Sequence, residues 1–478
     1  MSIVIHWFRQ DLRLFDNPSL FEAAKSGAIL PIYILDNYNS TEYSIGSASR
    51  WWLYHSLKKL NNALNGKLIT CQGNPEKILL ELAQHHNVQI VHWNRCYEPW
   101  QIKRDQNLKT TLIDHNIQVK TYNGSLLWEP WEILKSDGSP YKVFTPYYRN
   151  GCLRNILQKK TLPKPTLLFA QYNQTSNIED LKLLPESSWY KKLDQYWNIG
   201  EKAATQRIDS FIQKGLVGYK EGRNFPARHN VSKLSPHLHF GEISPNYLWY
   251  KITSQESMRY NSDIDYFCRE LGWREFSYYL LYHFPTLPKQ NFNTKFNSFP
   301  WEQNLNYLTL WQQGKTGITI VDAGMRELLQ TGYIHNRVRM IAASFLVKNL
   351  RLHWSHGASW FWQCLVDADL ANNSFNWQWV AGCGTDTMPY FRIFNPVTQG
   401  QKFDPTGEYT RKYVPELQNI TDKYLFNPWE APKHILQNAG IELSITYPMP
   451  IIDLKKSRQS ALDAFALMKR ATEDNPII

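Results

Sequence analysis

The stretch SIVIHWFRQDLRLFDNPSLFEAAKSGAILPIYIL, residues 2–35, decides the fold of the chain. Residues 3–7 and 29–35 are short apolar, β-branched runs, whereas residues 17–25 between them have the apolar spacing of an amphipathic helix. A strand, a helix and a second strand in this order are the unit from which parallel sheets with crossover helices are built. The sequence therefore predicts an α/β domain around this stretch.

The same alternation continues to about residue 125. We expect further strands at 67–71, 88–93 and 118–122, and helices at 48–65, 75–86 and 100–115. These elements predict a Rossmann-like α/β domain with a parallel five-stranded sheet. The sequence of this domain contains no GxGxxG fingerprint of a dinucleotide site.

The rest of the chain reads differently. Residues 131–199 are irregular and rich in Pro, Ser, Asn and Lys, which indicates a long interdomain linker. Beyond residue 200, helical periodicity dominates, at 203–214, 263–283, 320–330, 337–349 and 358–368. We expect an α/β domain at 1–130, a linker at 131–199 and an all-α domain at 200–478.

Composition narrows the class of protein. The chain has 478 residues, of which 43% are hydrophobic and 20% charged, so it is an ordinary globular protein. The excess of 53 basic over 42 acidic residues, a net charge of +11, favours a polyanionic partner: DNA, RNA or an acidic membrane surface. Nineteen tryptophans indicate stacking platforms or redox-active rings beside the core.

Several other classes are excluded. No apolar run reaches the roughly 18 residues of a membrane span, and the start has no signal-peptide pattern, so we expect a cytoplasmic protein, associated with the nucleoid if prokaryotic.

Six cysteines without CxxC pairing and 14 scattered histidines predict neither a disulfide framework nor a metal site. The GKT run at 314–316 is a turn, because Thr309 stands where a phosphate loop needs Gly. With GxSxG also missing, an organic cofactor is the remaining source of chemistry.

Polar groups inside apolar helices mark where a site should be sought. Each also has a plain structural interpretation, as an N-cap, a surface ion pair or a solvated face, and from the residues alone both interpretations stay open. The candidates are Ser232, Lys233 and Ser235; Glu270 with Trp273 and Arg274 on one helix; Asn336 and Met340, four residues apart on one helix face; and Asp367 and Asp369, followed by Asn373, Trp377 and Trp379.

Longer motifs carry a resemblance. In order along almost the whole chain stand HWFRQDLRLFDNPSL, WNRCYEPW, YKVFTPYYR, LSPHLHFGEISP, ELGWREF, GKTG, VDAGMRELLQTGYIHNRVRMIAASFLVKNL, DADLANN, WQWVAGCGTD and PYFRIFNPVTQGQKFD. Together they resemble the DNA photolyase and cryptochrome family, and most closely its class I cyclobutane pyrimidine dimer photolyases. Ten motifs in register leave little room for chance.

The resemblance implies an α/β antenna domain and a helical domain that holds one reduced FAD per chain. Arg339 resembles the ion-pair partner of Asp367. Asn373 stands at the position facing flavin N5, where many cryptochromes carry Asp or Cys. The residues that match the family's cofactor contacts are Tyr219, Ser232, Lys233, Leu234, Ser235, Asn336, Arg339, Asp367, Asp369 and Asn373.

The resemblance further implies light-driven splitting of cyclobutane dimers by electron transfer from photoexcited reduced FAD to a flipped-out dimer. Asn336 and Met340 match the dimer-specific enzymes, whereas (6-4) photolyases carry histidines for acid chemistry. Glu270 would hydrogen-bond the dimer carbonyls and stabilise developing negative charge. Trp273 and Trp379 would be apolar walls around the two bases.

Three further sets are implied in the same way. Trp301, Trp354 and Trp377 match the family's electron-hopping chain, although core packing is the commoner role of tryptophan. The candidate DNA-phosphate contacts are Arg223, Arg274, Arg337, Arg392 and Lys402. A second, antenna chromophore, folate or deazaflavin, is poorly specified, because Gln101 stands where folate-binding members have Glu.

The expected function is therefore repair of UV-damaged DNA by a monomer with no membrane partner. A blue-light-signalling cryptochrome is the main alternative, disfavoured by the photolyase-type residues at 270, 336, 340 and 373 and by the end of the sequence soon after the family core. A (6-4) photolyase and a basic, tryptophan-rich single-strand binder are the others.

Overall fold

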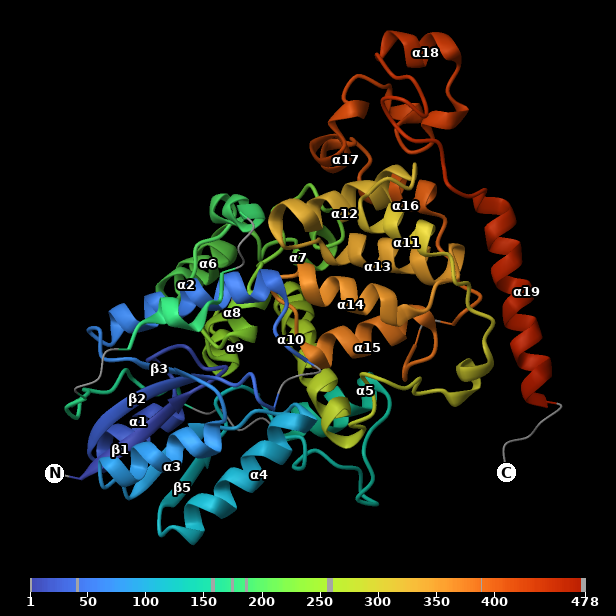
Figure 1. The fold of residues 1–478 in the computed structure, drawn as a ribbon. Helices are drawn as coiled ribbons and strands as arrows, with labels where there is room; N and C mark the ends of the chain where they lie inside the picture. Colours follow the sequence, from blue (N-terminus) through green and yellow to red (C-terminus); the bar gives the residue numbers. More distant parts are fainter. Residues whose placement is uncertain are drawn as a thin grey trace. The chain divides into compact units, whose positions relative to one another are not determined.

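The computed structural model describes residues 2–39, 43–155, 160–172, 176–184, 188–255, 261–387 and 389–473 (Figure 1). Two compact units make up the chain, and each combines segments that are distant in sequence. Unit 1 consists of Met1–Val217, Ser232–Pro285 and Val366–Ala371; unit 2 consists of Gly218–Val231, Thr286–Leu365 and Asn372–Ile478. The units therefore do not follow the predicted domain boundaries.

A parallel five-stranded sheet lies in unit 1, as predicted. Its strand order is β3-β2-β1-β4-β5, with β1 in the centre between β2 and β4. The central pairing aligns Trp7 with Ile32 on one side and with Trp93 on the other. The strand bounds are β1 Ile3–Phe8, β2 Ala28–Leu35, β3 Ile69–Gln72, β4 Ile90–Asn94 and β5 Gln118–Tyr122.

Helices cover the sheet because its strands carry apolar side chains on both sides. Trp7, Ile32 and Val91 share a buried core with Leu79 of α3 and Leu108 of α4 (Figure 1). Local signals start these helices: Asn17 caps α1 by accepting from the Leu20 amide at 3.1 Å, with Pro18 at the first helical position. The bounds are α1 Pro18–Ser26, α2 Ser47–Ala63, α3 Pro75–His85 and α4 Pro99–Asp114.

The predicted linker is not a free connection. Residues 168–170 lie beside the start of β2, where the Ile29 amide donates to the Leu168 carbonyl (2.8 Å) and the Ala170 amide donates to the Ile29 carbonyl (3.0 Å). Earlier in the predicted linker, Phe144 stacks on Trp273 with ring centroids 3.6 Å apart. Irregular backbone of this kind carries no periodic signal, so its packing onto unit 1 could not be read from the sequence.

The remaining helices of unit 1 are short except for α10. Their bounds are α5 Phe144–Pro146, α6 Glu201–Lys214, α8 Ser235–His239, α9 Pro245–Thr253 and α10 Asn261–His283, with a π-helical turn at Tyr147–Cys152 and 3₁₀ turns at Leu153–Asn155, Ile178–Leu181 and Ser188–Gln195.

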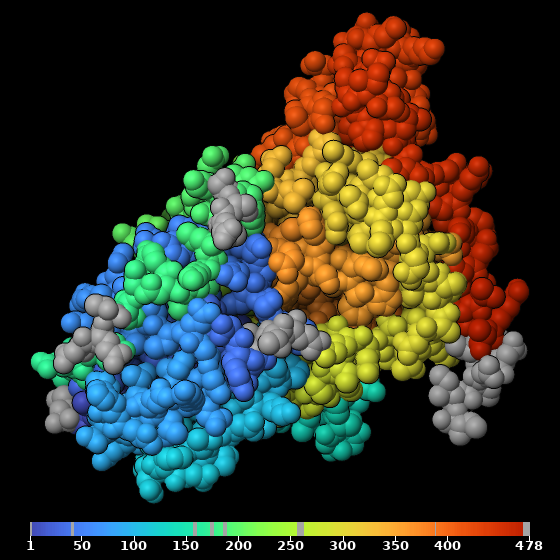
Figure 2. Space-filling model, in the orientation of Figure 1, coloured from blue at the N-terminus to red at the C-terminus, as the bar shows by residue number. Residues whose placement is uncertain are grey.

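Unit 2 is helical, as predicted, and α12 lies at its centre, in contact with α13, α16 and α17. Figures 1 and 2 show the segment from α17 to α18 as a lobe at one end of this unit, while α19 runs along its side. The bounds are α7 Tyr219–Gly222, α11 Leu305–Gln312, α12 Thr319–Thr331, α13 Asn336–Ser344, α14 Trp354–Cys364, α15 Leu370–Ala381, α16 Pro396–Phe403, α17 Glu408–Tyr413, α18 Lys433–Asn438 and α19 Leu454–Glu473.

Two helix positions differ from the prediction for local reasons. The helix predicted at 358–368 is α14, which begins earlier because the His353 imidazole caps it by accepting from the Ser355 amide at 3.2 Å. It ends before the predicted point, since Leu365 is extended. The helix predicted at 337–349 is α13 followed by a π-helical turn, Phe345–Asn349. No helix among the described residues is long and apolar enough to cross a membrane.

A buried arginine fastens the loop after β1 to the segment that carries α8. The Arg13 guanidinium, 2% exposed, donates to the carbonyls of Phe15, Asp16, Gly124 and Gly241 at 2.7–3.2 Å. Gly241 has φ +65°, and a Cβ there would lie 2.0 Å from the Gln10 carbonyl oxygen. This close approach fixes where α8 ends.

Replacing this arginine should therefore destabilise unit 1. Arg13→Met would leave four buried carbonyls without their donor, and we expect a loss of about 3–5 kcal/mol in the free energy of unfolding. The control Lys25→Met removes a surface ion pair with Glu22 and a surface contact with the Phe21 ring, and it should change the free energy of unfolding by about 1 kcal/mol or less. Denaturant titration of both variants measures the difference; equal losses would show that Arg13 is not a clamp.

Candidate functional site

Two sequence candidates meet in unit 1. Ser235, the first residue of α8, donates its hydroxyl to Oδ2 of Asp367 at 2.5 Å. Before it, Lys233 has a left-handed backbone, φ +52°, and a solvent-exposed side chain, while Leu234 is buried. The apolar residue anchors the loop, and the strained turn leaves the hydroxyl and ammonium groups of 232–235 on its outer side. This arrangement suits an anionic ligand better than a simple helix cap.

Asp369 lies at the centre of a second buried group in unit 1. Its Oδ2 accepts a short hydrogen bond from the Tyr278 hydroxyl and lies 3.3 Å from His239 Nδ1. Asp369 is 6% exposed, and Tyr278 is also buried. The segments 235–239, α10 and 366–371 are thereby tied to one carboxylate, so the geometry of the site depends on it.

Glu98 belongs to the same group and was not singled out in the sequence, although it lies in the WNRCYEPW motif. Its Oε2 accepts from the Trp100 indole N–H at 2.6 Å. Burial, and then the negative charge of Asp369, raise the Glu98 pKa from 4.5 to about 7. Glu98 therefore holds a proton near neutral pH in this group, which consists of Glu98, Asp369, Tyr278 and His239. We call it the Asp369 group.

Helix α10 carries three of the predicted site residues, Glu270, Trp273 and Arg274, in different environments. Glu270 is half-buried, as expected for a carboxyl among aromatic rings. Trp273 is half-buried and one face of its indole is covered by Phe144. Only its remaining surface is left for the wall predicted from the sequence.

The structure contradicts the prediction that Arg274 contacts DNA phosphates. Its guanidinium is 12% exposed, donates to Glu275 at 2.8 Å and to the Ser125 carbonyl at 2.9 Å, and so cannot serve as a phosphate contact. Its ion-pair partner is the adjacent Glu275, not Glu270 at i−4. Helical spacing shows which side chains are neighbours, but burial of Glu275 decides which of them pairs.

In unit 2, α13 presents the two residues that were matched to dimer-specific enzymes. Asn336 is exposed at the first turn and Met340 is half-buried one turn later, so they share a face as predicted. The His335 imidazole accepts from the Arg337 amide at 3.2 Å and thereby fixes where the helix begins. Neither side chain supplies a proton at neutral pH.

Arginines gather beside this helix. Arg337 donates to Asn224 in a short hydrogen bond and lies 4.4 Å over the Phe403 ring, while Lys402 lies 5.3 Å over the same ring. Burial and the nearby charge of Arg223 lower the Arg337 pKa. Arg228 lies 4.0 Å over Phe225, which contacts Phe403 in turn. We call this set the basic cluster: Arg223, Arg228, Arg337 and Lys402, with Phe225 and Phe403.

The basic cluster contains three of the predicted phosphate contacts and adds Arg228, which the sequence analysis missed. The signal was present, since RNFPAR at 223–228 alternates basic and aromatic residues. Bringing cations this close together has an electrostatic cost, which a polyanion would offset. The remaining predicted contact, Arg392, is exposed on another loop, where its carbonyl accepts from the buried Lys348 ammonium at 3.0 Å.

The three predicted electron-transfer tryptophans lie around α14 in unit 2. Trp301 and Trp354 both contact the ring of His353, with centroids 5.1 and 5.3 Å apart. Trp354 is buried and donates its indole N–H to Asn291 at 2.8 Å. Trp377 packs against Gly357, one turn after Trp354, so closely that a Cβ there would lie 2.1 Å from its ring. These contacts show packing of the three rings, and their electron-transfer role stays a prediction.

The remaining predicted residues have identifiable positions. Asn373 of α15 donates to the Ala358 carbonyl at 3.0 Å, and Arg339 donates to the Ile334 carbonyl at 2.7 Å and lies over the Tyr333 ring. Tyr219 is buried in α7 and Trp379 is half-buried in α15. The pairing of Arg339 with Asp367 stays a prediction.

The donor set of these segments is compatible with FAD. Hydroxyl and ammonium groups at 232–235 suit a pyrophosphate, and the carboxylates of Asp367 and Asp369 suit hydroxyl and N–H groups. Among the described residues, no group of three or more His, Cys, Asp or Glu side chains could hold a metal ion.

Comparison with known proteins decides the family. Residues 4–166 match the DNA photolyase model, and residues 267–467 match the FAD binding domain of DNA photolyase. The chain belongs to the DNA photolyase/cryptochrome family. This confirms three predictions from the sequence: the family resemblance, the parallel five-stranded sheet and the helical FAD-binding domain.

The relatives of this chain include proteins named photo-lyase and proteins named cryptochrome. A deoxyribodipyrimidine photo-lyase of Agrobacterium fabrum is 43% identical over 98% of each chain. Cryptochrome-2 of Arabidopsis thaliana is 35% identical over 98% of this chain and 79% of the relative. The crystal structure of a bacterial class III photolyase from Agrobacterium tumefaciens superposes with a TM-score of 0.95 over 98% of each chain, at 43% identity. The expected class I assignment is therefore not confirmed.

The raised Glu98 pKa predicts a pH-dependent stability. Below pH 4.5 Glu98 is protonated in both folded and unfolded chains; as the pH rises toward 7, only the unfolded chain releases the proton freely. The free energy of unfolding should fall over this range by up to about 3 kcal/mol more than in Glu98→Gln, which keeps an acceptor for Trp100.

Denaturation of both proteins at pH 5 and pH 8 measures this difference. Glu132→Gln, at an exposed side chain, is the control and should follow the unmodified protein. Parallel pH curves for the protein and Glu98→Gln would show that Glu98 is not held in the predicted environment.

Proposed function

We propose that this chain is a light-dependent DNA repair enzyme that splits cyclobutane pyrimidine dimers. The observation that carries the proposal is the 43% identity, over 98% of both chains, to a relative named deoxyribodipyrimidine photo-lyase. The residue types of α13 and the basic cluster support it. The 43% identity to a bacterial class III photolyase supports class III, in place of class I, as the proposed subclass.

FAD is the proposed cofactor and, in its reduced form, supplies an electron when it absorbs blue light. Ser232 and Lys233 would bind its phosphates, while Ser235, whose single hydroxyl proton is donated to Asp367, would contact the cofactor as an acceptor. Asp369 is held by Tyr278 and His239, so it can present a fixed acceptor to the cofactor without reorganising. Leu234, Tyr219, Asn336, Arg339 and Asn373 complete the proposed contacts.

The dimer would be held by polar and aromatic groups of modest charge. Glu270 would orient the dimer carbonyls, and Asn336 and Met340 would offer an amide and a thioether rather than an acid. Splitting a cyclobutane ring requires no obligatory proton transfer, whereas the (6-4) product requires movement of an oxygen-bearing group. The side chains of α13 therefore favour the cyclobutane lesion. Trp379 and the uncovered part of Trp273 would exclude water from it.

The Trp301, His353 and Trp354 rings, with Trp377 of α15 packed against Gly357 of α14, would carry electrons toward an oxidised cofactor. The basic cluster would contact DNA phosphates. Such contacts position a duplex without reading its sequence, and a weakly stacked dimer costs less to extrude than intact bases. A second chromophore of the folate or deazaflavin class stays a proposal without assigned residues.

Cryptochrome-type signalling is the second candidate, because cryptochromes from a plant are 32–35% identical to this chain. A signalling photoreceptor of this fold has no need to revert DNA lesions. Repair activity therefore separates the two candidates.

The test is a repair assay with both ultraviolet lesions. Purified protein with reductant and blue light should convert thymine cyclobutane dimers in an oligonucleotide to thymines, and should leave (6-4) products unchanged. A dark sample is the control. Repair confined to (6-4) products would contradict the interpretation of Asn336 and Met340, and repair of neither lesion would favour signalling.

The basic cluster predicts salt-dependent binding. Each phosphate contact adds about 0.9 to the slope of log affinity against log salt concentration, so Arg337→Ala should lower that slope by about one. The matched control Lys456→Ala, at an exposed residue of α19, should leave it unchanged. Binding of a dimer-containing duplex at several salt concentrations measures both slopes; an unchanged slope in Arg337→Ala would remove the cluster from the interface.

A further inference from the structure

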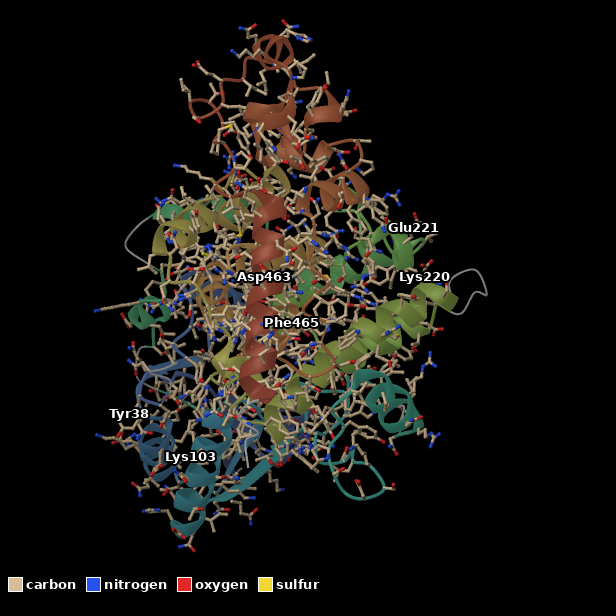
Figure 3. The ribbon with its side chains drawn as sticks, turned by 90° about the vertical axis from the view of Figure 1, so that its right-hand side faces the viewer. Tyr38, Lys103, Lys220, Glu221, Asp463 and Phe465 are labelled. Atoms are coloured by element: carbon tan, nitrogen blue, oxygen red, sulfur yellow. The ribbon has the colours of Figure 1, made fainter. Side chains whose placement is uncertain are left out.

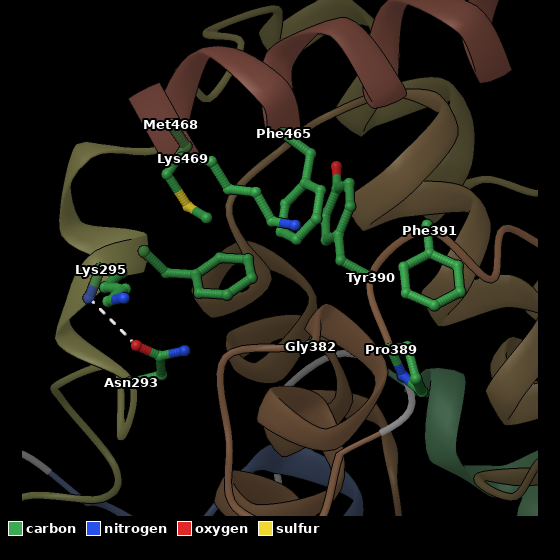
Figure 4. A pocket seen from close by; sticks show the side chains of 10 residues that line it. Asn293, Lys295, Gly382, Pro389, Tyr390, Phe391, Phe465, Met468 and Lys469 are labelled. Atoms are coloured by element: carbon green, nitrogen blue, oxygen red, sulfur yellow. Dashed lines mark hydrogen bonds between the residues drawn. The ribbon is translucent and has the colours of Figure 1, made fainter. Parts of the chain in front are cut away.

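A cavity of about 400 Å³ lies in unit 2, apart from every residue discussed as part of the candidate site (Figure 4). Three short segments and one helix line it: the turn at 293–296, Gly382 after α15, the loop 389–391, and α19. Its size falls in the range of small-molecule sites. Nothing in the proposed repair chemistry uses these residues.

Aromatic rings form its apolar walls. Tyr390 and Phe465 are stacked, with centroids 4.9 Å apart and an interplanar angle of 16°. Phe296 contacts both, at 5.9 and 6.2 Å. Phe391, on the neighbouring loop, is 57% exposed, which is a large exposure for a phenylalanine. A flat ring could therefore stack here without displacing core residues.

The polar lining is cationic. The ten described residues that line the cavity include Lys295 and Lys469 but no carboxylate. The Lys469 ammonium lies 4.9 Å over the Phe465 ring, which holds a positive charge directly at the aromatic wall. The Tyr390 hydroxyl points toward α19 (Figure 4) and is buried without a hydrogen-bond partner. The two lysines therefore carry the charge of the lining, and they favour an anionic ligand.

Helix α19 supplies both kinds of group from one side. Figure 3 shows Phe465 and Asp463 on this helix, and Asp463 is exposed and does not line the cavity. Phe465 and Lys469 are four residues apart and therefore share a helix face. The helix thus presents an aromatic ring and a cation together toward the turn 293–296.

We propose that this cavity binds a nucleotide unit, with its base stacked on the aromatic wall and its phosphate held by Lys295 and Lys469. Stacking tolerates any base, since each has a π-face, whereas the two ammonium groups require an anion. The nucleotide could be free in solution or an unpaired unit of a nucleic-acid strand. The chemistry is the same for both.

The experiment measures binding in the dark, with undamaged ligand, so its outcome is separate from that of the repair assay. Thymidine 5′-monophosphate is titrated by ligand-observed NMR into the full-length protein, and thymidine is titrated as the uncharged control. We expect saturable binding of the monophosphate below about 1 mM and at least about tenfold weaker binding of thymidine.

Variants assign the binding to this cavity. Lys295→Glu/Lys469→Glu and Phe391→Ala each alter exposed side chains and should weaken monophosphate binding about tenfold or more, at an unchanged melting temperature. Lys455→Glu, exposed on the same helix but outside the cavity, should bind as the unmodified protein does.

A short thymidine oligonucleotide distinguishes the two sources. If the monophosphate does not bind but oligonucleotide affinity falls in Phe391→Ala and in the double lysine variant, and not in Lys455→Glu, the ligand is a strand nucleotide and the proposal holds. If neither ligand responds to these variants, the cavity is not a nucleotide site.

Discussion

The carboxylate of Asp369 is the constraint on which the candidate site depends. It accepts from Tyr278, contacts His239 and lies near Glu98, so four stretches of unit 1 that are far apart in sequence are fixed to one another. A buried carboxylate without such donors would be neutralised or expelled. Because its partners come from the β4 loop, α8 and α10, the site can form only after the sheet and these helices have folded together.

Arg13 extends this constraint to the backbone. It joins the loop after β1 to Gly124 and Gly241, and Gly241 directly follows the segment that carries α8. The segment that carries Ser235 is thus fastened at Gly241 by Arg13, and the Ser235 hydroxyl is held by its hydrogen bond to Asp367. A site built this way is held in place before a ligand arrives, which is what an electron-transfer or recognition site requires.

The sequence predicted the regular elements well because their apolar periods are strong. All five strands were predicted within two residues at each end, and the Asn17 and Pro18 pair marked the start of α1. The packing of residues 131–199 was missed, since contacts such as Phe144 on Trp273 and Leu168 beside Ile29 leave no periodic trace. Glu98 and Arg228 were missed because single polar residues reveal their burial or neighbours only in three dimensions. The phosphate-contact role predicted for Arg274 was wrong because its guanidinium is 12% exposed and is already bonded to Glu275 and the Ser125 carbonyl.

The repair function proposed for this chain presupposes that the segments around Asp367 and Asp369 retain a flavin. The most direct measurement is the amount of FAD that remains with the purified chain after gel filtration, compared with Asp369→Leu, which has a similar volume but no carboxylate. The account predicts about one FAD per chain and a large loss in the variant, with circular dichroism showing both proteins folded. Purified chain that stays folded but neither carries FAD nor takes it up when it is added would contradict the account.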